Sequence, residues 1–167
     1  MKQGKNKKIN QKGFTLLELT VAIFVIAVGI IGALSALQRA TSTTFVSSSK
    51  LTAAYLAQEG IEIVRNLRDT NWITGLSWDN GIICCFTPPC DCEADYNDKY
   101  LNLYQENHYL RIDNGFFNYD LGDETKFKRK ITISKEPDIL KISVQVSWKE
   151  RGKDFQLTAQ ENIYDWK

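Results

Sequence analysis

The chain has 167 residues, enough for one domain of ordinary size, and its average composition is globular, with 43% hydrophobic and 25% charged residues. Residues 1–13 hold five of the 21 basic residues, which leaves 16 basic against 20 acidic residues, a net charge of −4, for residues 14–167. An acidic main portion gives no support to general binding of nucleic acid, and no specific nucleic acid is predicted as a partner.

The apolar residues are concentrated near the N-terminus. Leu16–Leu37 is a run of 22 residues whose only charged member is Glu18. As a helix it is about 33 Å long, enough to cross a hydrocarbon core once. Because the lysines precede it, we expect the N-terminus on the cytoplasmic side and everything after the run outside. A secretory signal peptide cut near Ala36 is disfavoured, because the run is longer than a usual signal core and begins with an acid.

A short motif stands where the basic leader meets this run: Gly13-Phe14-Thr15-Leu16-Leu17-Glu18. A glycine ends the leader, an aromatic residue follows, and a lone acid opens the apolar helix. This pattern resembles the cleavage signal of type IV prepilins and of type II secretion pseudopilins. The resemblance implies that a prepilin peptidase cuts between Gly13 and Phe14 and that the new N-terminal residue is N-methylated.

The same resemblance assigns a role to Glu18. Its carboxylate would neutralise the α-amine of Phe14 in an adjacent subunit and so set the stagger of subunits in a filament. A carboxylate that only reaches toward the lipid headgroups is the alternative. The implied partners are the prepilin peptidase, other pilins or pseudopilins, and the inner-membrane assembly platform.

Residues 28–38 and 53–62 resemble the minor-pilin branch with the V- and I-type pseudopilins. The chain has no proline before Pro88, whereas major pilins usually carry one in or near the apolar segment. Gly29, Gly32 and Ala33 are small residues that allow close packing of helices in the membrane, although glycine is common in such spans.

The helical pattern continues beyond the apolar run to about Asp69. Residues 51–69 carry a stripe at a spacing of 3.6 residues, made of Ala53, Leu56, Gly60, Ile63 or Val64, and Leu67. One helix from Phe14 to Asp69 is expected, about 84 Å long. Two helices hinged near 41–49 are the alternative.

The second half of the chain alternates with a period of two. Strands are predicted at 108–112, 126–134, 140–148 and 154–160, joined by Pro-Asp and Arg-Gly turns, after an insert of short strands and turns at 70–107. This indicates an antiparallel sheet with one apolar face. The expected fold class is α+β: a pilin-like N-terminal helix packed on a C-terminal antiparallel sheet. The expected segments are a removed leader (1–13), a transmembrane half-helix (14–37), an extracytoplasmic half-helix (38–69) and a β-rich head (70–167).

Four cysteines, Cys84, Cys85, Cys90 and Cys92, fall within nine residues of the part expected outside the membrane, where disulfides persist. Four cysteines allow three pairings that sequence cannot distinguish. We favour two bonds, with Cys85–Cys90 nested inside Cys84–Cys92. Free thiols and a zinc or iron site are the alternatives, and no metal or cofactor is predicted.

The remaining polar clusters are assigned no chemistry. The acidic stretch 91–98 lacks the glycine and the closing glutamate of a calcium loop and is predicted to be solvated. Lys126, Lys128, Arg129 and Lys130 are predicted to form a solvated strand edge. The only histidine, His108, has no motif partner, and Gly75–Asp79 lacks the last glycine of a nucleophile elbow.

These features together predict a structural protein and not an enzyme. It would be a single-pass protein of the cytoplasmic membrane that assembles into an extracytoplasmic or cell-surface filament. The expected function is that of a minor type IV pilin that primes or caps the filament in adhesion, motility or DNA uptake. A type II secretion pseudopilin, or a filament-tip adhesin that binds through residues 70–120, is the alternative.

Overall fold

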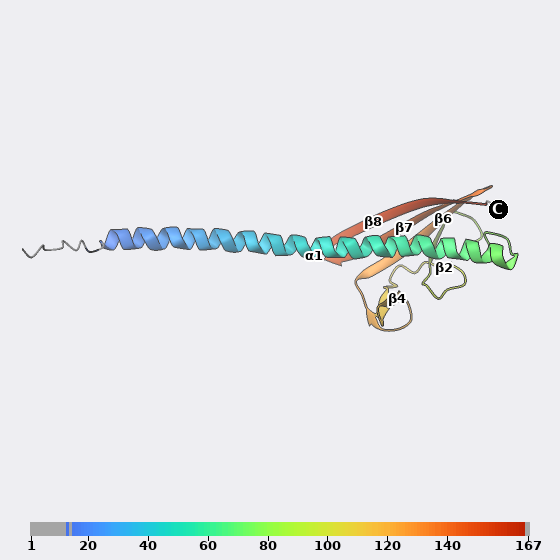
Figure 1. Ribbon diagram of the computed structural model, residues 1–167, viewed down its shortest axis with the longest axis horizontal. Helices are drawn as coiled ribbons and strands as arrows, with labels where there is room; N and C mark the ends of the chain where they lie inside the picture. Colours follow the sequence, from blue (N-terminus) through green and yellow to red (C-terminus); the bar gives the residue numbers. More distant parts are fainter. Residues whose placement is uncertain (1–12, 14, 166–167) are drawn as a thin grey trace, which may run out of the picture. The chain divides into compact units, whose positions relative to one another are not determined.

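The computed structural model describes Gly13 and residues 15–165, and the chain divides into two compact units between Phe45 and Val46. Within these described residues one α-helix comes first, followed by eight strands (Figure 1). The elements are α1 (Leu16–Thr74), β1 (Cys90–Glu93), β2 (Asn102–Leu103), β3 (Arg111–Asp113), β4 (Phe116–Asn118), β5 (Asp123–Glu124), β6 (Phe127–Glu136), β7 (Ile139–Glu150) and β8 (Lys153–Tyr164).

The helix α1 is continuous through residues 41–49, so the alternative of two hinged helices is wrong. It ends five residues later than predicted. Gly75, at φ +75°, follows the last helical residue, and its N–H donates to the carbonyl of Trp72 at 3.2 Å. The N–H of Leu76 donates to the carbonyl of Asn71 at 2.9 Å. These two bonds form a Schellman motif, which satisfies carbonyls that the helix end would leave unpaired.

Five strands form one antiparallel sheet in the order β2-β1-β6-β7-β8. The last three are consecutive in sequence and form the predicted meander, which runs alongside the second part of α1 in Figure 1. Both predicted turns are confirmed: Pro137–Asp138 joins β6 to β7 and Arg151–Gly152 joins β7 to β8. The strands β4, β3 and β5 form a separate small sheet.

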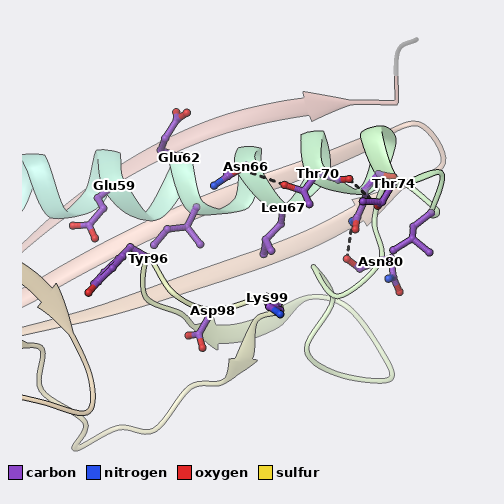
Figure 2. Close-up of a pocket in the computed structure, with 13 residues that line it drawn as sticks. Glu59, Glu62, Asn66, Leu67, Thr70, Thr74, Asn80, Tyr96, Asp98 and Lys99 are labelled. Atoms are coloured by element: carbon purple, nitrogen blue, oxygen red, sulfur yellow. Dashed lines mark hydrogen bonds between the residues drawn. The ribbon is translucent and has the colours of Figure 1, made fainter.

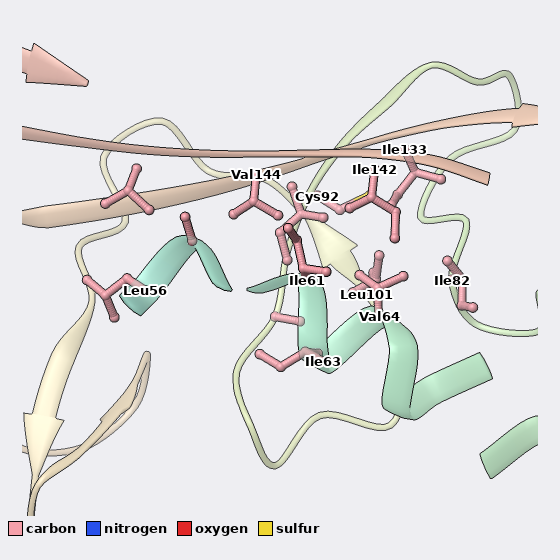
Figure 3. Close-up of a cluster of buried hydrophobic side chains, with 14 of the residues drawn as sticks. Leu56, Ile61, Ile63, Val64, Ile82, Cys92, Leu101, Ile133, Ile142 and Val144 are labelled. Carbon is pink, nitrogen blue, oxygen red and sulfur yellow. The ribbon is translucent and has the colours of Figure 1, made fainter. Parts of the chain in front are cut away.

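The core lies between one face of this sheet and the predicted stripe of α1 (Figure 3). Alternate residues of β6 and β7 are buried, as a strand with one covered face requires. The helix contributes Ala53, Leu56, Gly60, Ile63 and Val64, all buried, with Leu67 half-buried. The predicted α+β fold class is therefore confirmed.

Gly60 marks the closest approach of helix to sheet. A Cβ atom built there would lie 2.8 Å from Cγ1 of Val144 and 3.1 Å from Cδ of Arg129. Any side chain at this position would push α1 away from β6 and β7. Glycine is conformationally costly within a helix, so the close contact supplies the reason for its presence.

The predicted solvated edge at 126–130 is wrong. β6 is an interior strand, between β1 and β7, and the Arg129 side chain is fully buried on its inner face. Its guanidinium donates to the carbonyls of Ala94 (2.7 Å) and Leu56 (3.3 Å). Because these residues are basic, the alternation of the strand was not recognised in the sequence. Arg129 occupies one of the inward-facing positions of this alternation.

The prediction of a solvated loop at 91–98 is correct only in part: residues 94–98 lie outside the strands, and Tyr96 and Asn97 are exposed. Cys90–Glu93 is strand β1, and Glu93 and Asp95 are buried. Glu93 accepts a hydrogen bond from the N–H of Gln105 and contacts Nδ1 of His108 at 2.7 Å. These partners replace the water that a carboxylate needs.

The predicted strand at 108–112 is displaced. Only Arg111–Asp113 is a strand, and it belongs to the small sheet. Residues 108–110 are irregular, and the N–H of Leu110 donates to the carbonyl of Phe127. Strands of two or three residues are too short for their alternation to be recognised in a sequence.

Candidate processing and assembly site

The start of α1 is built around Thr15 and Glu18. The Thr15 hydroxyl accepts a hydrogen bond from the Glu18 N–H at 3.3 Å, and the Thr15 carbonyl accepts the Leu19 N–H at 3.1 Å. Thr15 is therefore the N-cap, and the spacing Thr-x-x-Glu is that of a capping box. The acid also lies in the first turn, where the helix dipole favours negative charge. The motif thus fixes where the helix begins and places a carboxylate in its first turn.

The residues predicted for processing, filament assembly and helix packing are all exposed where the structure describes them. Gly13 is exposed, and Phe14 lies outside the described residues. Glu18 and Ala33 are exposed on α1. A Cβ atom at Gly29 or Gly32 would meet no atom of the described chain within 4 Å, so both positions present open helix surface.

The first part of α1 exposes its apolar side chains. By length and composition α1 is long and apolar enough to cross a membrane, and its most apolar window of 18 residues has a mean hydropathy of 2.5 with none of the window buried. Leu16, Phe24 and Ile31 are 82%, 68% and 64% exposed. A soluble monomer rarely exposes such a surface, which therefore requires lipid or other helices as cover.

Residues 8–34 match the family model described as the prokaryotic N-terminal methylation motif. The chain carries a type IV prepilin-like signal. This signal supports a type IV pilin or a pseudopilin, implies processing by prepilin peptidase, and supports membrane anchoring through α1. Pilin-like families are structural and not enzymatic. The chain shows no significant match to a curated protein or to a solved structure.

The four cysteines form two disulfides, Cys84–Cys92 and Cys85–Cys90, which is the nested arrangement favoured from the sequence. Cys90 and Cys92 belong to β1 and are buried, whereas Cys84 and Cys85 lie in the preceding loop. The two bonds therefore tie this loop to an interior strand. Within residues 13 and 15–165, no group of His, Cys, Asp or Glu is arranged to hold a metal ion.

A groove of about 600 Å³ lies between the end of α1 and the loops that follow it (Figure 2). Ile63 and Leu67 form part of its apolar lining, with Leu76 and Tyr96 on the loop side. Tyr96 is 49% exposed and its ring lies 5.3 Å from that of Phe116, which is 60% exposed. An accessible aromatic pair thus borders the groove.

The carboxylates of Glu93, Asp95, Asp98 and Asp120 form an acidic cluster around the loop that follows β1. Burial, together with the carboxylates of Asp95, Asp120 and Glu93, raises the pKa of Asp98, although the Asp95 N–H donates to Asp98 and opposes that change. Burial also raises the pKa of the Tyr119 hydroxyl, whose ring packs against His108. These groups make the loop an electrostatically crowded region of the head.

Sequence reasoning missed the capping role of Thr15 and the groove in Figure 2. The Thr-x-x-Glu spacing is a signal that identifies such a cap. The groove in Figure 2 has no comparable signal, because its walls come from α1 and from residues 76–99, which the fold alone brings together.

Proposed function

We propose that this chain is a minor subunit of a type IV pilus-like filament, which it primes or caps. The observation that carries the proposal is the prepilin-like signal at 8–34, followed by a helix whose apolar first part is exposed along its whole length. Such a helix needs either lipid or a bundle of like helices around it. A filament subunit uses both environments in turn.

Processing comes first in this proposal. The leader 1–13 stays in the cytoplasm and is removed after Gly13, and Phe14 becomes the N-methylated terminus. Residues 14–37 then anchor the chain in the membrane with its N-terminus inside, residues 38–69 continue the helix outside, and 70–167 form the head. The five lysines of the leader support this orientation.

Assembly depends on Glu18. A carboxylate in the first turn of an apolar helix is costly in lipid unless a cation neutralises it. The α-amine of Phe14 in a neighbouring subunit is the cation proposed here. Close packing of the helices would use Gly29, Gly32 and Ala33, where the helix surface is open. Other pilins and the inner-membrane assembly platform are the partners.

The test is the intact mass and N-terminal sequence of the chain produced together with its prepilin peptidase. A chain that begins at methylated Phe14 is expected. A chain that begins at Met1, or one cut after Ala36, would refute the proposal. Glu18→Ala should then abolish incorporation into filaments while leaving cleavage intact. Glu62→Ala, which removes an exposed carboxylate elsewhere on α1, is the matched control and should incorporate normally.

Binding through the head is a second candidate function, favoured by the groove in Figure 2 and the exposed Tyr96–Phe116 pair. Exposed aromatic side chains are frequent energetic centres of interfaces. Tyr96→Ala and Phe116→Ala should leave filament assembly unchanged and reduce surface binding if the chain is an adhesin. A deletion of 79–98 would not discriminate, because it removes the interior strand β1.

A type II secretion pseudopilin remains the related alternative. Loss of secretion with normal surface pili, on deletion of the gene, would favour it over a pilus subunit.

A further inference from the structure

Among the residues that the structure describes, no strand pairs with one edge of β8. It is the last strand of the five-stranded sheet and runs for 12 residues, from Lys153 to Tyr164, with β7 on one side only (Figure 1). An edge of this length presents a row of backbone donors and acceptors, and proteins usually protect such edges.

The turn before β8 shows which residues face the free edge. Arg151 and Gly152 both have positive φ, at 50° and 78°, and join the directly paired residues Glu150 and Lys153. This is a two-residue turn of the type I′ class, whose flanking residues exchange hydrogen bonds. The bonded pairs then recur at every second residue.

The far end of the strand follows the same alternation, because the N–H of Asp165 donates to the carbonyl of Asp138 at 3.1 Å. Odd-numbered residues of β8 therefore bond to β7, and even-numbered residues direct their N–H and C=O groups to the free edge. The six even-numbered residues of the strand are all exposed.

The usual protection is missing from the middle of this edge. Residues 155–160 contain no proline and no charged side chain. The side chains of Gln156 and Gln160 turn back over the sheet, where they form hydrogen bonds with Gln145 and Ser143 of β7. They leave the backbone of the edge open.

A groove of about 330 Å³ runs beside the same edge, between β8 and α1. Ile61 on the helix and Leu157 and Ala159 on the strand supply its apolar surface. Leu157 and Ala159 are only half-buried, because no further strand of the described chain lies beyond β8. A strand added to β8 would bring every second side chain over this groove.

The groove is electrically polarised. α1 and β8 run in the same direction here, since Ser49 contacts Glu150 at one end and Arg65 contacts Glu161 at the other. At the second end Glu62 and Glu161 share the single cation Arg65, which leaves a net charge of −1.

The region around the β7–β8 turn, at the start of β8, is basic. Lys126 pairs there with Glu150, and Arg151 and Lys153 belong to the turn and to the first position of β8. Three cations and one anion give this region a net charge of +2.

We propose that the free edge of β8 and the adjoining groove bind an extended segment of another polypeptide as a sixth strand. Its side chains facing the groove are small and apolar. The bound segment carries an acidic residue near Lys153 and a basic residue near Glu161, so that its charges are complementary to those at the two ends of β8. Main-chain bonds supply affinity and the groove supplies side-chain selectivity in this mode of recognition.

A second copy of β8 is not the occupant. Antiparallel pairing of two β8 strands would match their charges, but it would direct the two α1 helices oppositely. Subunits that enter one filament share one direction, so they do not adopt that arrangement, and this step rests on the assembly proposed above.

The test uses the full chain in detergent micelles and labelled, capped peptides of alternating Thr and Val. One peptide carries Asp first and Lys last, and the other has the reverse order. Fluorescence anisotropy should show that one order binds at least tenfold more tightly than the other. N-methylation of the amides of alternate peptide residues should abolish binding for one set and preserve it for the other. Failure of both peptides to bind would overturn the proposal.

Thr158→Pro should weaken binding about tenfold, because it removes an N–H at the free edge without breaking a bond to β7. Thr158→Val keeps that N–H and should bind as the wild type. Ala159→Leu fills the groove and should also weaken binding. Equal binding by the wild type and Thr158→Pro would overturn the proposal. It would also be overturned if sedimentation showed that the wild-type chain associates with itself and that Thr158→Pro does not, because β8 would then pair with a second copy.

Discussion

The Arg129 guanidinium, buried on the inner face of β6, lies 3.4 Å from the Glu59 carboxylate on α1 (Nη1 to Oε2). The same side chain donates to the carbonyl of Ala94, just beyond β1. One side chain therefore links the helix, the interior of the sheet and the disulfide-bonded segment. Arginine keeps its charge when it is buried, so its partners are structurally required.

Glu59→Gln is expected to destabilise the head more than a typical substitution at a partly exposed position does. Glu59 is 32% exposed, but its replacement leaves a fully buried cation without its counter-charge. We expect a loss of about 1–3 kcal/mol in the free energy of unfolding, measured by chemical denaturation of the full chain in detergent. Arg129→Ala, which also opens a cavity, should cost about 3–5 kcal/mol.

Arg65→Gln is the control for this prediction. Arg65 also pairs with glutamates, Glu62 and Glu161, but at the surface. Surface pairs contribute up to about 1 kcal/mol. A loss from Arg65→Gln as large as that from Glu59→Gln would contradict the proposed role of burial.

Gly60→Ala is predicted to destabilise the head although alanine is the better helix former. The gain in helix propensity is about 1 kcal/mol. The added methyl group would meet the fully buried Val144 at 2.8 Å, and such overpacking costs about 1–3 kcal/mol. We expect a net loss of up to about 2 kcal/mol, measured by thermal unfolding.

A double mutant separates the two effects in this prediction. Val144→Ala removes the methyl groups that meet the new side chain, so Gly60→Ala should cost less in that background than in the wild type. Gln58→Ala, at an exposed position of the same helix, should change stability by less than about 0.5 kcal/mol. Equal costs of Gly60→Ala in both backgrounds would exclude a clash with Val144 as the cause.

The disulfides should contribute less than additively, because one loop lies within the other. Replacing all four cysteines by alanine is expected to lower the free energy of unfolding by about 2–3 kcal/mol. Replacing only Cys85 and Cys90 should cost less than half of that, because Cys84–Cys92 still restrains the same segment. Denaturation under non-reducing conditions measures both values. Two equal and additive losses would show that each bond acts independently.

The sequence predicted the parts of this fold that repeat. The stripe from Ala53 to Val64 and the alternation in β6, β7 and β8 extend over many residues, so each period is recognisable. The N-terminal motif was equally clear because glycine, aromatic residue, acid and apolar run must fall in register. The nested pairing of the cysteines was favoured and is confirmed, but the sequence could not distinguish it from the two other pairings.

The errors at 126–130 and 91–98 have a common physical cause, which is that charged residues are buried only with partners distant in sequence. Arg129 was placed at a solvated edge because its partners Leu56, Glu59 and Ala94 are 35 to 73 residues away. Glu93 was placed in a solvated loop because His108 and Gln105 are 15 and 12 residues away. Composition describes such segments as polar, and only the folded chain shows where their charges are satisfied.

The crowded carboxylates around Asp98 give a prediction about pH. Burial and the neighbouring carboxylates raise the pKa of Asp98, so folding disfavours its charged form. The contribution of Asp98 to the stability of the fold is fully present below its pKa in the unfolded chain, about 3.9. This contribution is lost as the pH rises through the higher pKa of Asp98 in the folded chain. Asp98→Asn keeps an oxygen that accepts the Asp95 N–H and removes the charge. It should raise the melting temperature at pH 7, and the difference should vanish near pH 3.

Asp91→Asn is the control of opposite sign. A hydrogen bond from the Thr132 hydroxyl at 2.7 Å, and the Lys130 ammonium at 3.1 Å, lower the pKa of Asp91 despite its partial burial. The charged form stabilises the fold above the unfolded pKa, and this contribution is lost as the pH falls through the folded value. Asp91→Asn should therefore lower the melting temperature at pH 7 and have less effect in acid. Two variants that shift in the same direction would show that overall charge, and not local environment, controls the pH response.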